Sequence, residues 1–155
     1  MILDLQEVKK IDLSKFYYLC NDEYKAYFSN DRSYYKLLAY ISTFFSNQTL
    51  YEIGSEHGHS AMALSYNETN KVVSIDKIGN SVIRELLFWP NIDFRLYEGI
   101  YQYIDEISKS PFIFLDACHH GVYGTQFEYN LYHFLSQDSF KGILLIDDIY
   151  INDVI

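Results

Sequence analysis

Short runs of apolar residues recur from residue 49 onward, and each is long enough for one β-strand. Four are rich in β-branched or aromatic residues, and Ile92–Leu96 is a weaker fifth; the four are Thr49–Ile53, Val72–Ile75, Phe112–Leu115 and Ile143–Ile146. Runs that are apolar almost throughout are typical of strands buried on both faces of a parallel sheet. The pattern therefore predicts five such strands.

The segments between these runs are long enough for crossover helices. The candidates are Ser60–Tyr66, Ser81–Trp89, Tyr101–Lys109 and Thr125–Leu135. The last is the best marked, because Thr125 and Glu128 have the spacing of a capping box. This alternation predicts an α/β fold: a Rossmann-like, doubly wound, mainly parallel sheet with flanking helices.

Residues 1–48 differ from the rest, since they contain no Gly and no Pro and are rich in Tyr and Phe. Apolar positions at helical spacing predict an amphipathic helix over Asp31–Phe45. Such a helix either packs on the sheet or also roofs a substrate pocket, and plain packing is the favoured interpretation. With no repeat or linker, we expect one domain over 1–155: a helical segment at 1–48 and an α/β core at 49–150.

Charge and composition exclude several functions. The 155 residues include 12 Lys and Arg against 21 Asp and Glu, a net charge of −9. That balance argues against binding nucleic acid or an anionic membrane. No stretch is apolar for long enough to span a bilayer, and the first ten residues do not read as a signal peptide. Cys20 and Cys118 lie too far apart for a metal or redox pair, so we expect a reduced, cytoplasmic protein.

Most of the predicted strands end at an acid, a glycine or both. These residues are Glu52 and Gly54, Asp76, Glu98 and Gly99, Asp116, then Asp147 and Asp148. Any one of them alone is explained as a turn former or helix cap. Because the carboxyl ends of strands form the ligand crevice of an open α/β sheet, the whole set favours a site at that edge.

The turn after the first strand is the most informative segment. Gly54 permits a tight turn, Gly58 lets the backbone approach a ligand, and Ser60 can cap the next helix and offer a hydroxyl. No Lys follows, and the third glycine of a dinucleotide fingerprint is absent. Asp76, 22 residues beyond Gly54, can accept both hydroxyls of a ribose. These features favour an adenosine ligand without a pyrophosphate.

At this point the chain resembles the class I S-adenosylmethionine-dependent methyltransferases, and within them the catechol-type small-molecule O-methyltransferases. The likeness spans residues 49–150 and centres on Glu52-x-Gly54-x-x-x-Gly58-x-Ser60. It implies that the turn, Ser55 included, cradles the methionine half of the cofactor and that Ser60 contacts it. The resemblance also assigns the ribose to Asp76, the adenine surroundings to Gly99 and Gln102, and the closure of the reaction centre to Asp116.

The resemblance further implies a metal and a base. Asp116, Asp147 and Asp148 match the family's metal ligands, with Asp148 where Asn is usual, so Mg²⁺ or another divalent cation is expected. The alternative is that these acids are generic turn residues. His119 stands where metal-dependent members carry a Lys, and we expect it to act with Asp116 in catalysis unless it belongs to a solvated loop.

One departure from the family concerns the sheet. The family sheet has seven strands, the last two forming a hairpin, whereas this sequence stops at Ile155. We expect the last two strands to be lacking, in a natural short form or in a fragment. The fifth strand would then be an uncovered edge through which the chain forms a homo-oligomer.

The leading hypothesis is a methyltransferase that uses S-adenosylmethionine to methylate a hydroxyl of a small-molecule acceptor. One alternative is a Rossmann-type oxidoreductase, against which the lack of a pyrophosphate site counts. Another is a non-catalytic, truncated cofactor-binding domain. Neither nucleic acid nor membrane is an expected partner.

Overall fold

Five parallel strands form one sheet at the centre of the computed structural model, which describes residues 2–30, 34–77, 82–96, 100–117, 121–137 and 140–147. The strands are β1 (Thr49–Ile53), β2 (Lys71–Asp76), β3 (Ile92–Leu96), β4 (Phe112–Leu115) and β5 (Ile143–Ile146), in the spatial order β3-β2-β1-β4-β5. All neighbouring pairs are parallel. The predicted α/β fold is confirmed, and four of the five strands have the predicted bounds.

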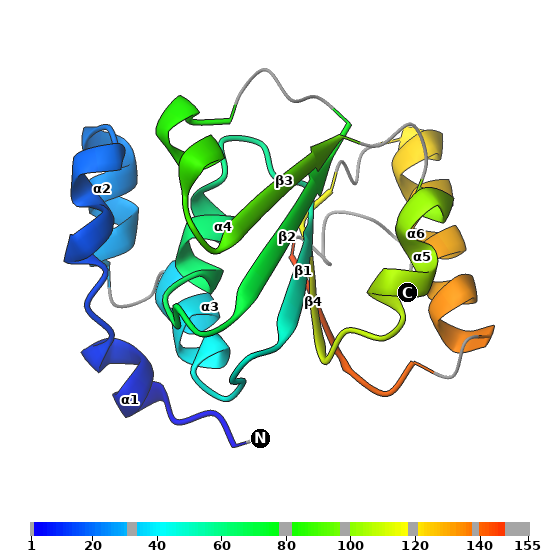
Figure 1. The fold of residues 1–155 in the computed structure, drawn as a ribbon, viewed down its shortest axis with the longest axis horizontal. Coiled ribbons are helices and arrows are strands. Elements are labelled where there is room, and N and C mark those ends of the chain that lie inside the picture. The colour runs from blue at the N-terminus through cyan, green and yellow to red at the C-terminus, as the bar shows by residue number, and fades with distance from the viewer. Residues whose placement is uncertain are drawn as a thin grey trace.

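Helices cover both faces of this sheet (Figure 1). One face carries α3 (Tyr34–Ser42), α4 (His59–Leu64) and the 3₁₀ helix η2 (Arg84–Phe88). The other carries η3 (Ile100–Tyr103), α5 (Ile104–Ile107) and α6 (Gly121–Gln137). Side chains alternate between the two faces along each strand, so the sheet separates two apolar cores. Among the described helices, none is both long and apolar enough to cross a membrane.

The N-terminal segment lies outside α3 and α4 as α1 (Leu5–Lys10), η1 (Ser14–Leu19) and α2 (Asp22–Ser29). Asp4 caps α1 by accepting the Gln6 N–H at 2.8 Å, and Asn21 caps α2 in the same manner. The side chains of Phe16 and Phe28 are fully buried in the core on the α4 face. These two aromatic side chains therefore serve as core residues.

Several of the predicted helices differ from those observed, and the one expected over Tyr101–Lys109 is the 3₁₀ helix η3 followed by the short α5. The helix expected over Asp31–Phe45 is described only from Tyr34 to Ser42, and residues 31–33 lie outside the described part. The segment before Pro90 forms only the 3₁₀ helix Arg84–Phe88. The capping box at Thr125 is wrong, because α6 already begins at Gly121 and a capping residue must precede the first turn.

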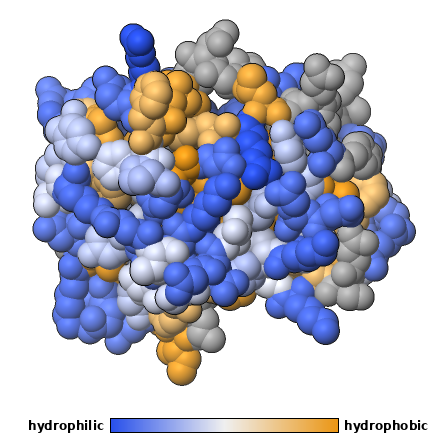
Figure 2. All heavy atoms as spheres, in the orientation of Figure 1, coloured by the Kyte–Doolittle hydropathy of each residue, from blue (hydrophilic) through white to orange (hydrophobic). Residues whose placement is uncertain are grey.

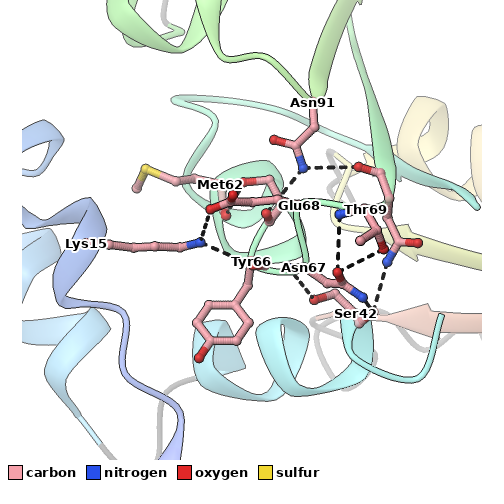
Figure 3. A network of polar contacts seen from close by, with 10 residues as sticks. Lys15, Ser42, Met62, Tyr66, Asn67, Glu68, Thr69 and Asn91 are labelled. Atoms are coloured by element: carbon pink, nitrogen blue, oxygen red, sulfur yellow. Dashed lines mark hydrogen bonds and ion pairs between the residues drawn. The ribbon is translucent and has the colours of Figure 1, made fainter. Parts of the chain in front are cut away.

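Asparagine side chains close the loops at the amino edge of the sheet, where the strands begin. Asn67 Nδ2 and Asn70 Nδ2 both donate to the Phe45 carbonyl, at 2.7 and 3.1 Å. Asn70 also donates to the Ser42 carbonyl and accepts the Gln48 N–H. Figure 3 shows part of this network. Asparagine side chains of the α4–β2 connection thereby hold the main chain of the α3–β1 connection.

Polar residues cover most of the face seen in Figure 2, with separate apolar patches between them. The most exposed large apolar side chains of the described residues are Ile2 at 86% and Phe88 at 81%. Isolated apolar side chains of this kind are ordinary on a protein surface.

Candidate ligand site at the carboxyl edge of the sheet

Four residues form one row across the carboxyl ends of the strands. In the order of the sheet they are Asp76, Gly54, Asp116 and Asp147. The Gly54 N–H donates to the Ile75 carbonyl at 2.8 Å, and the N–H groups of Asp116 and Asp147 continue this ladder at 2.9 and 3.0 Å. The chain reverses its direction of travel across the sheet between β1 and β4, which is where open α/β sheets bind ligands.

Gly54 lies at the middle of this row, and no other residue fits there. Its φ is +102°, and a Cβ would lie 1.9 Å from the carbonyl oxygen of Asp116. The predicted tight turn is confirmed. The structure adds a second reason for glycine, since its hydrogen lets the end of β1 pass close to the main chain after β4.

The turn after Gly54 is tied to the end of β2. Glu56 has a φ of +43°, and its N–H donates to Asp76 Oδ2 at 2.8 Å. Each carboxylate oxygen can accept more than one hydrogen bond, so this contact orients Asp76 and leaves its carboxylate able to accept others. Gly58 has a φ of +88° and is the residue before α4. The space its Cβ would need is occupied by Leu86 and Phe94, so packing explains this glycine; the approach of a ligand to its backbone stays a prediction.

The carboxyl group of Glu52 is completely buried beneath the turn. The hydroxyls of Ser60 on α4 and Ser74 on β2 donate to its two oxygens, and Ser55 Oγ lies 2.6 Å from Ser74 Oγ. Burial is the main cause that raises the pKa of Glu52 to about 8; the serine hydrogen bonds act in the opposite sense, and the charges of Asp116 and Asp76 add to the rise. The predicted capping role of Ser60 is wrong, because Gly58 occupies the cap position and the Ser60 hydroxyl bonds to Glu52 instead.

Aromatic rings of the N-terminal segment face the turn. The Tyr24 ring stacks on His59 with centroids 3.5 Å apart, and Phe28 stacks on Tyr35 at 4.6 Å. Burial, and secondarily the neighbouring His57, lowers the pKa of His59 to about 4. His59 is therefore a neutral, packed ring at neutral pH and is poorly suited to be a base.

Tyr34 on α3 lies near the row of residues at the carboxyl edge of the sheet. Its ring lies 4.3 Å from that of Tyr35 and 6.1 Å from that of Phe114. The pKa of Tyr34 is raised mainly by burial and by Tyr35, and further by the negative charges of Asp116 and Asp147. Those carboxylates thus act on one phenol, which supports their grouping at a single edge.

Two features of this site, Ser74 and the His59–Tyr24 stack, are not predicted from the sequence. Ser74 is the only polar residue in the run Val72–Ile75 and pairs in register with Glu52. A hydroxyl in an apolar strand is a usable signal, whereas its partner requires the strand register. The stacking of His59 on Tyr24 has no local signal, because it joins helices far apart in the sequence.

The remaining predicted residues are only partly described. Gln102 is exposed in η3, whereas Gly99, His119 and Asp148 lie outside the described residues, as do Glu98 and Cys118. Within the described residues, no three His, Cys, Asp or Glu side chains form a group that could hold a metal ion. Asp116 and Asp147 are neighbours in the row, so two of the three expected ligands are adjacent.

Comparisons with known proteins do not add a name to this site. A scan against protein-family models found no match, and a search of curated proteins found none either. The family resemblance therefore rests on the sequence motifs and stays a prediction, while the fold itself is an α/β, Rossmann-like sheet.

Proposed function

We propose that this protein is an S-adenosylmethionine-dependent methyltransferase that methylates a hydroxyl of a small molecule. The observation that carries the proposal is the junction of the glycine turn with Asp76. In the turn after β1, the Glu56 N–H donates to Asp76. This turn lies where the chain changes its direction across the sheet, between β1 and β4. A turn and an acid in this relation suit an adenosine ligand without a pyrophosphate.

Each part of the cofactor has a partner in this proposal. Asp76 accepts the ribose hydroxyls, and the main chain of Gly54–Gly58 surrounds the methionine half. Gln102 and Gly99 flank the adenine, and Asp116 lies between the cofactor and the acceptor. Once bound, S-adenosylmethionine supplies an electrophilic methyl group; the protein aligns the acceptor oxygen with it, which removes much of the entropic cost of the reaction.

The acceptor hydroxyl becomes a better nucleophile when its proton is removed. His119 is the proposed base. Asp116 and Asp147, with Asp148, would hold a divalent cation that lowers the pKa of the acceptor hydroxyl. His59 is excluded from the role of base by its stacking on Tyr24 and its lowered pKa.

Calorimetry with S-adenosylmethionine and with NAD tests the cofactor assignment. We expect S-adenosylmethionine to bind and Asp76→Ala to weaken it about tenfold or more, since each charge-assisted hydrogen bond contributes roughly 1.5–3 kcal/mol. Asp105→Ala is the matched control, because it removes an exposed acid on α5. Equal affinities of Asp76→Ala and the parent would refute the assignment, and binding of NAD alone would favour the oxidoreductase alternative.

Turnover separates an enzyme from a cofactor-binding domain. Methyl transfer to a pool of phenols and sugars is measured with Mg²⁺ and with excess chelator. Loss of activity in chelator and its recovery with Mg²⁺ would support the metal. Full activity in chelator would remove it, and cofactor binding without turnover would favour the non-catalytic alternative.

A further inference from the structure

Hydrogen bonds connect the buried Glu52 to the glycine turn through two serines. Glu52 Oε2 accepts the Ser74 hydroxyl, and Ser74 Oγ lies 2.6 Å from Ser55 Oγ in the turn. Glu52 and Ser74 are fully buried, and Ser55 is 3% exposed. Within the described parts of the chain, the bond to Ser74 is the only hydrogen bond of the Ser55 side chain. The connection therefore ends at a buried hydroxyl in the proposed cofactor turn.

The direction of these hydrogen bonds depends on the proton of Glu52, because each hydroxyl has one hydrogen to donate. An ionised carboxylate only accepts, so Ser74 donates to Glu52 and Ser55 donates to Ser74. A proton on Glu52 Oε2 reverses both bonds. Glu52 then donates to Ser74, Ser74 donates to Ser55, and the hydrogen of Ser55 is released for another acceptor.

We propose that Glu52 is a positioning residue that sets, through Ser74, whether Ser55 can donate a hydrogen bond to an anionic group in the turn. The inference rests on the proposed function, which places the carboxylate of the methionine half there. With a proton on Glu52 Oε2, Ser55 donates to that carboxylate. With Glu52 ionised, Ser55 donates to Ser74 and offers that carboxylate only lone pairs.

Charged and titratable groups face Glu52 from the neighbouring elements. Asp76 and Asp116, at the ends of β2 and β4, favour the protonated form of Glu52. Tyr35 on α3 remains a neutral phenol, since burial raises its pKa, and His59 on α4 remains a neutral imidazole. With a pKa of about 8, Glu52 changes charge between about pH 7 and pH 9, whereas Tyr35 and His59 stay neutral.

Ser60 provides a matched control. Its hydroxyl also donates to Glu52 and is 6% exposed. It lies on α4, and Glu52 is the only hydrogen-bond partner that its hydroxyl has within the described residues. Ser60→Ala therefore removes a hydrogen bond from the same carboxyl group and leaves the path from Glu52 to Ser55 intact.

The experiment measures the dissociation constants of S-adenosylmethionine and methylthioadenosine by calorimetry at about pH 7, 8 and 9. The proteins are the parent, Glu52→Gln, Ser74→Ala and Ser60→Ala. Glu52→Gln cannot ionise, so the ratio of parent to Glu52→Gln affinities cancels the titration of the ligand's own amino group. We expect this ratio to fall about tenfold from pH 7 to pH 9, as the protonated fraction of Glu52 falls. Methylthioadenosine lacks the carboxylate, and its ratio should stay constant.

The two serine variants test whether the effect of Glu52 reaches Ser55 through Ser74. For Ser74→Ala, the ratio of its S-adenosylmethionine affinity to that of Glu52→Gln should no longer change with pH. For Ser60→Ala, the same ratio should still fall as pH rises. A constant ratio for S-adenosylmethionine, or a dependence lost in Ser60→Ala and kept in Ser74→Ala, would overturn the inference while leaving the proposed function in place. Failure of both ligands to bind at pH 7 would instead refute the proposed function, and the inference with it.

Discussion

The two edges of the sheet differ in the kind of polar group that they bury. At the amino edge, neutral amides of Asn67 and Asn70 pair with main-chain groups of neighbouring loops. At the carboxyl edge, a carboxyl group is buried at Glu52, and Asp76, Asp116 and Asp147 follow one another across the strands. Buried amides with partners stabilise a fold without any dependence on pH, whereas a buried acid opposes folding once it ionises. The carboxyl edge thus carries a stability cost that function would explain.

The largest effect is expected for Gly54→Ala at the carboxyl edge. The new Cβ would lie 1.9 Å from a main-chain oxygen, and the residue has a positive φ, so two sources of strain combine. We expect a loss of roughly 3 kcal/mol or more in the free energy of unfolding, measured in urea. Gly58→Ala is the comparison, because its Cβ would meet side-chain atoms at 3.0 Å that can move. Equal losses in the two variants would show that the close approach of β1 and β4 is not limiting.

Glu52→Gln should show the difference between the edges as a dependence on pH. The folded pKa of about 8 lies above the unfolded value of about 4.5, so the native state binds the proton more tightly. The free energy of unfolding of the parent should therefore fall as pH rises from about 4.5 to about 8 and then level off. The variant should lack this decline and exceed the parent at about pH 9 by on the order of 3 kcal/mol.

Urea unfolding at a series of pH values from about 5 to 9 measures this difference. Glu106→Gln is the control, since that carboxylate is exposed and paired with Arg95, which lowers its pKa. Parallel pH profiles for the parent and Glu52→Gln would show that Glu52 is ionised throughout, and the buried-acid interpretation would then be wrong.

The sheet could be predicted from the sequence because four strands are local, mostly apolar runs and β3 alternates apolar and charged residues. Four strands match in both bounds. The acidic row could also be predicted, because parallel strands end at one edge. The Glu52–Ser74 contact could not, since it depends on strand register, and neither could the Tyr24–His59 stack, which joins helices distant in sequence. The local sequence pattern therefore predicts where the carboxyl edge lies, whereas the contacts of its side chains depend on the tertiary structure.

Asn70→Ala should weaken the amino edge without altering the carboxyl edge. The side chain is 1% exposed; its amide nitrogen donates to two main-chain carbonyls, and its amide oxygen accepts one main-chain N–H. Its removal takes the acceptor from the Gln48 N–H, whereas the Ser42 and Phe45 carbonyls still accept from Asn67, so we expect a loss of about 1 kcal/mol in the free energy of unfolding. The loss should be the same at about pH 5 and pH 9, as measured in urea, because an amide does not titrate. A loss that changes with pH would show that the two edges are coupled.

The smallest effect is expected where Lys15 joins the N-terminal segment to the amino edge. Figure 3 shows Lys15 reaching Tyr66 and Glu68; its Nζ lies 2.9 Å from Glu68 Oε1 and 4.9 Å from the centre of the Tyr66 ring. Glu68→Gln removes only an exposed ion pair, so the small loss of stability should vanish at about 1 M salt, where the screening length is about 3 Å. Lys15→Ala also removes the alkyl stem and the ring contacts, so part of its loss should persist at high salt. Thermal unfolding at low and high salt measures both variants. If both losses vanish in salt, the attachment is purely electrostatic and the ring contacts contribute nothing.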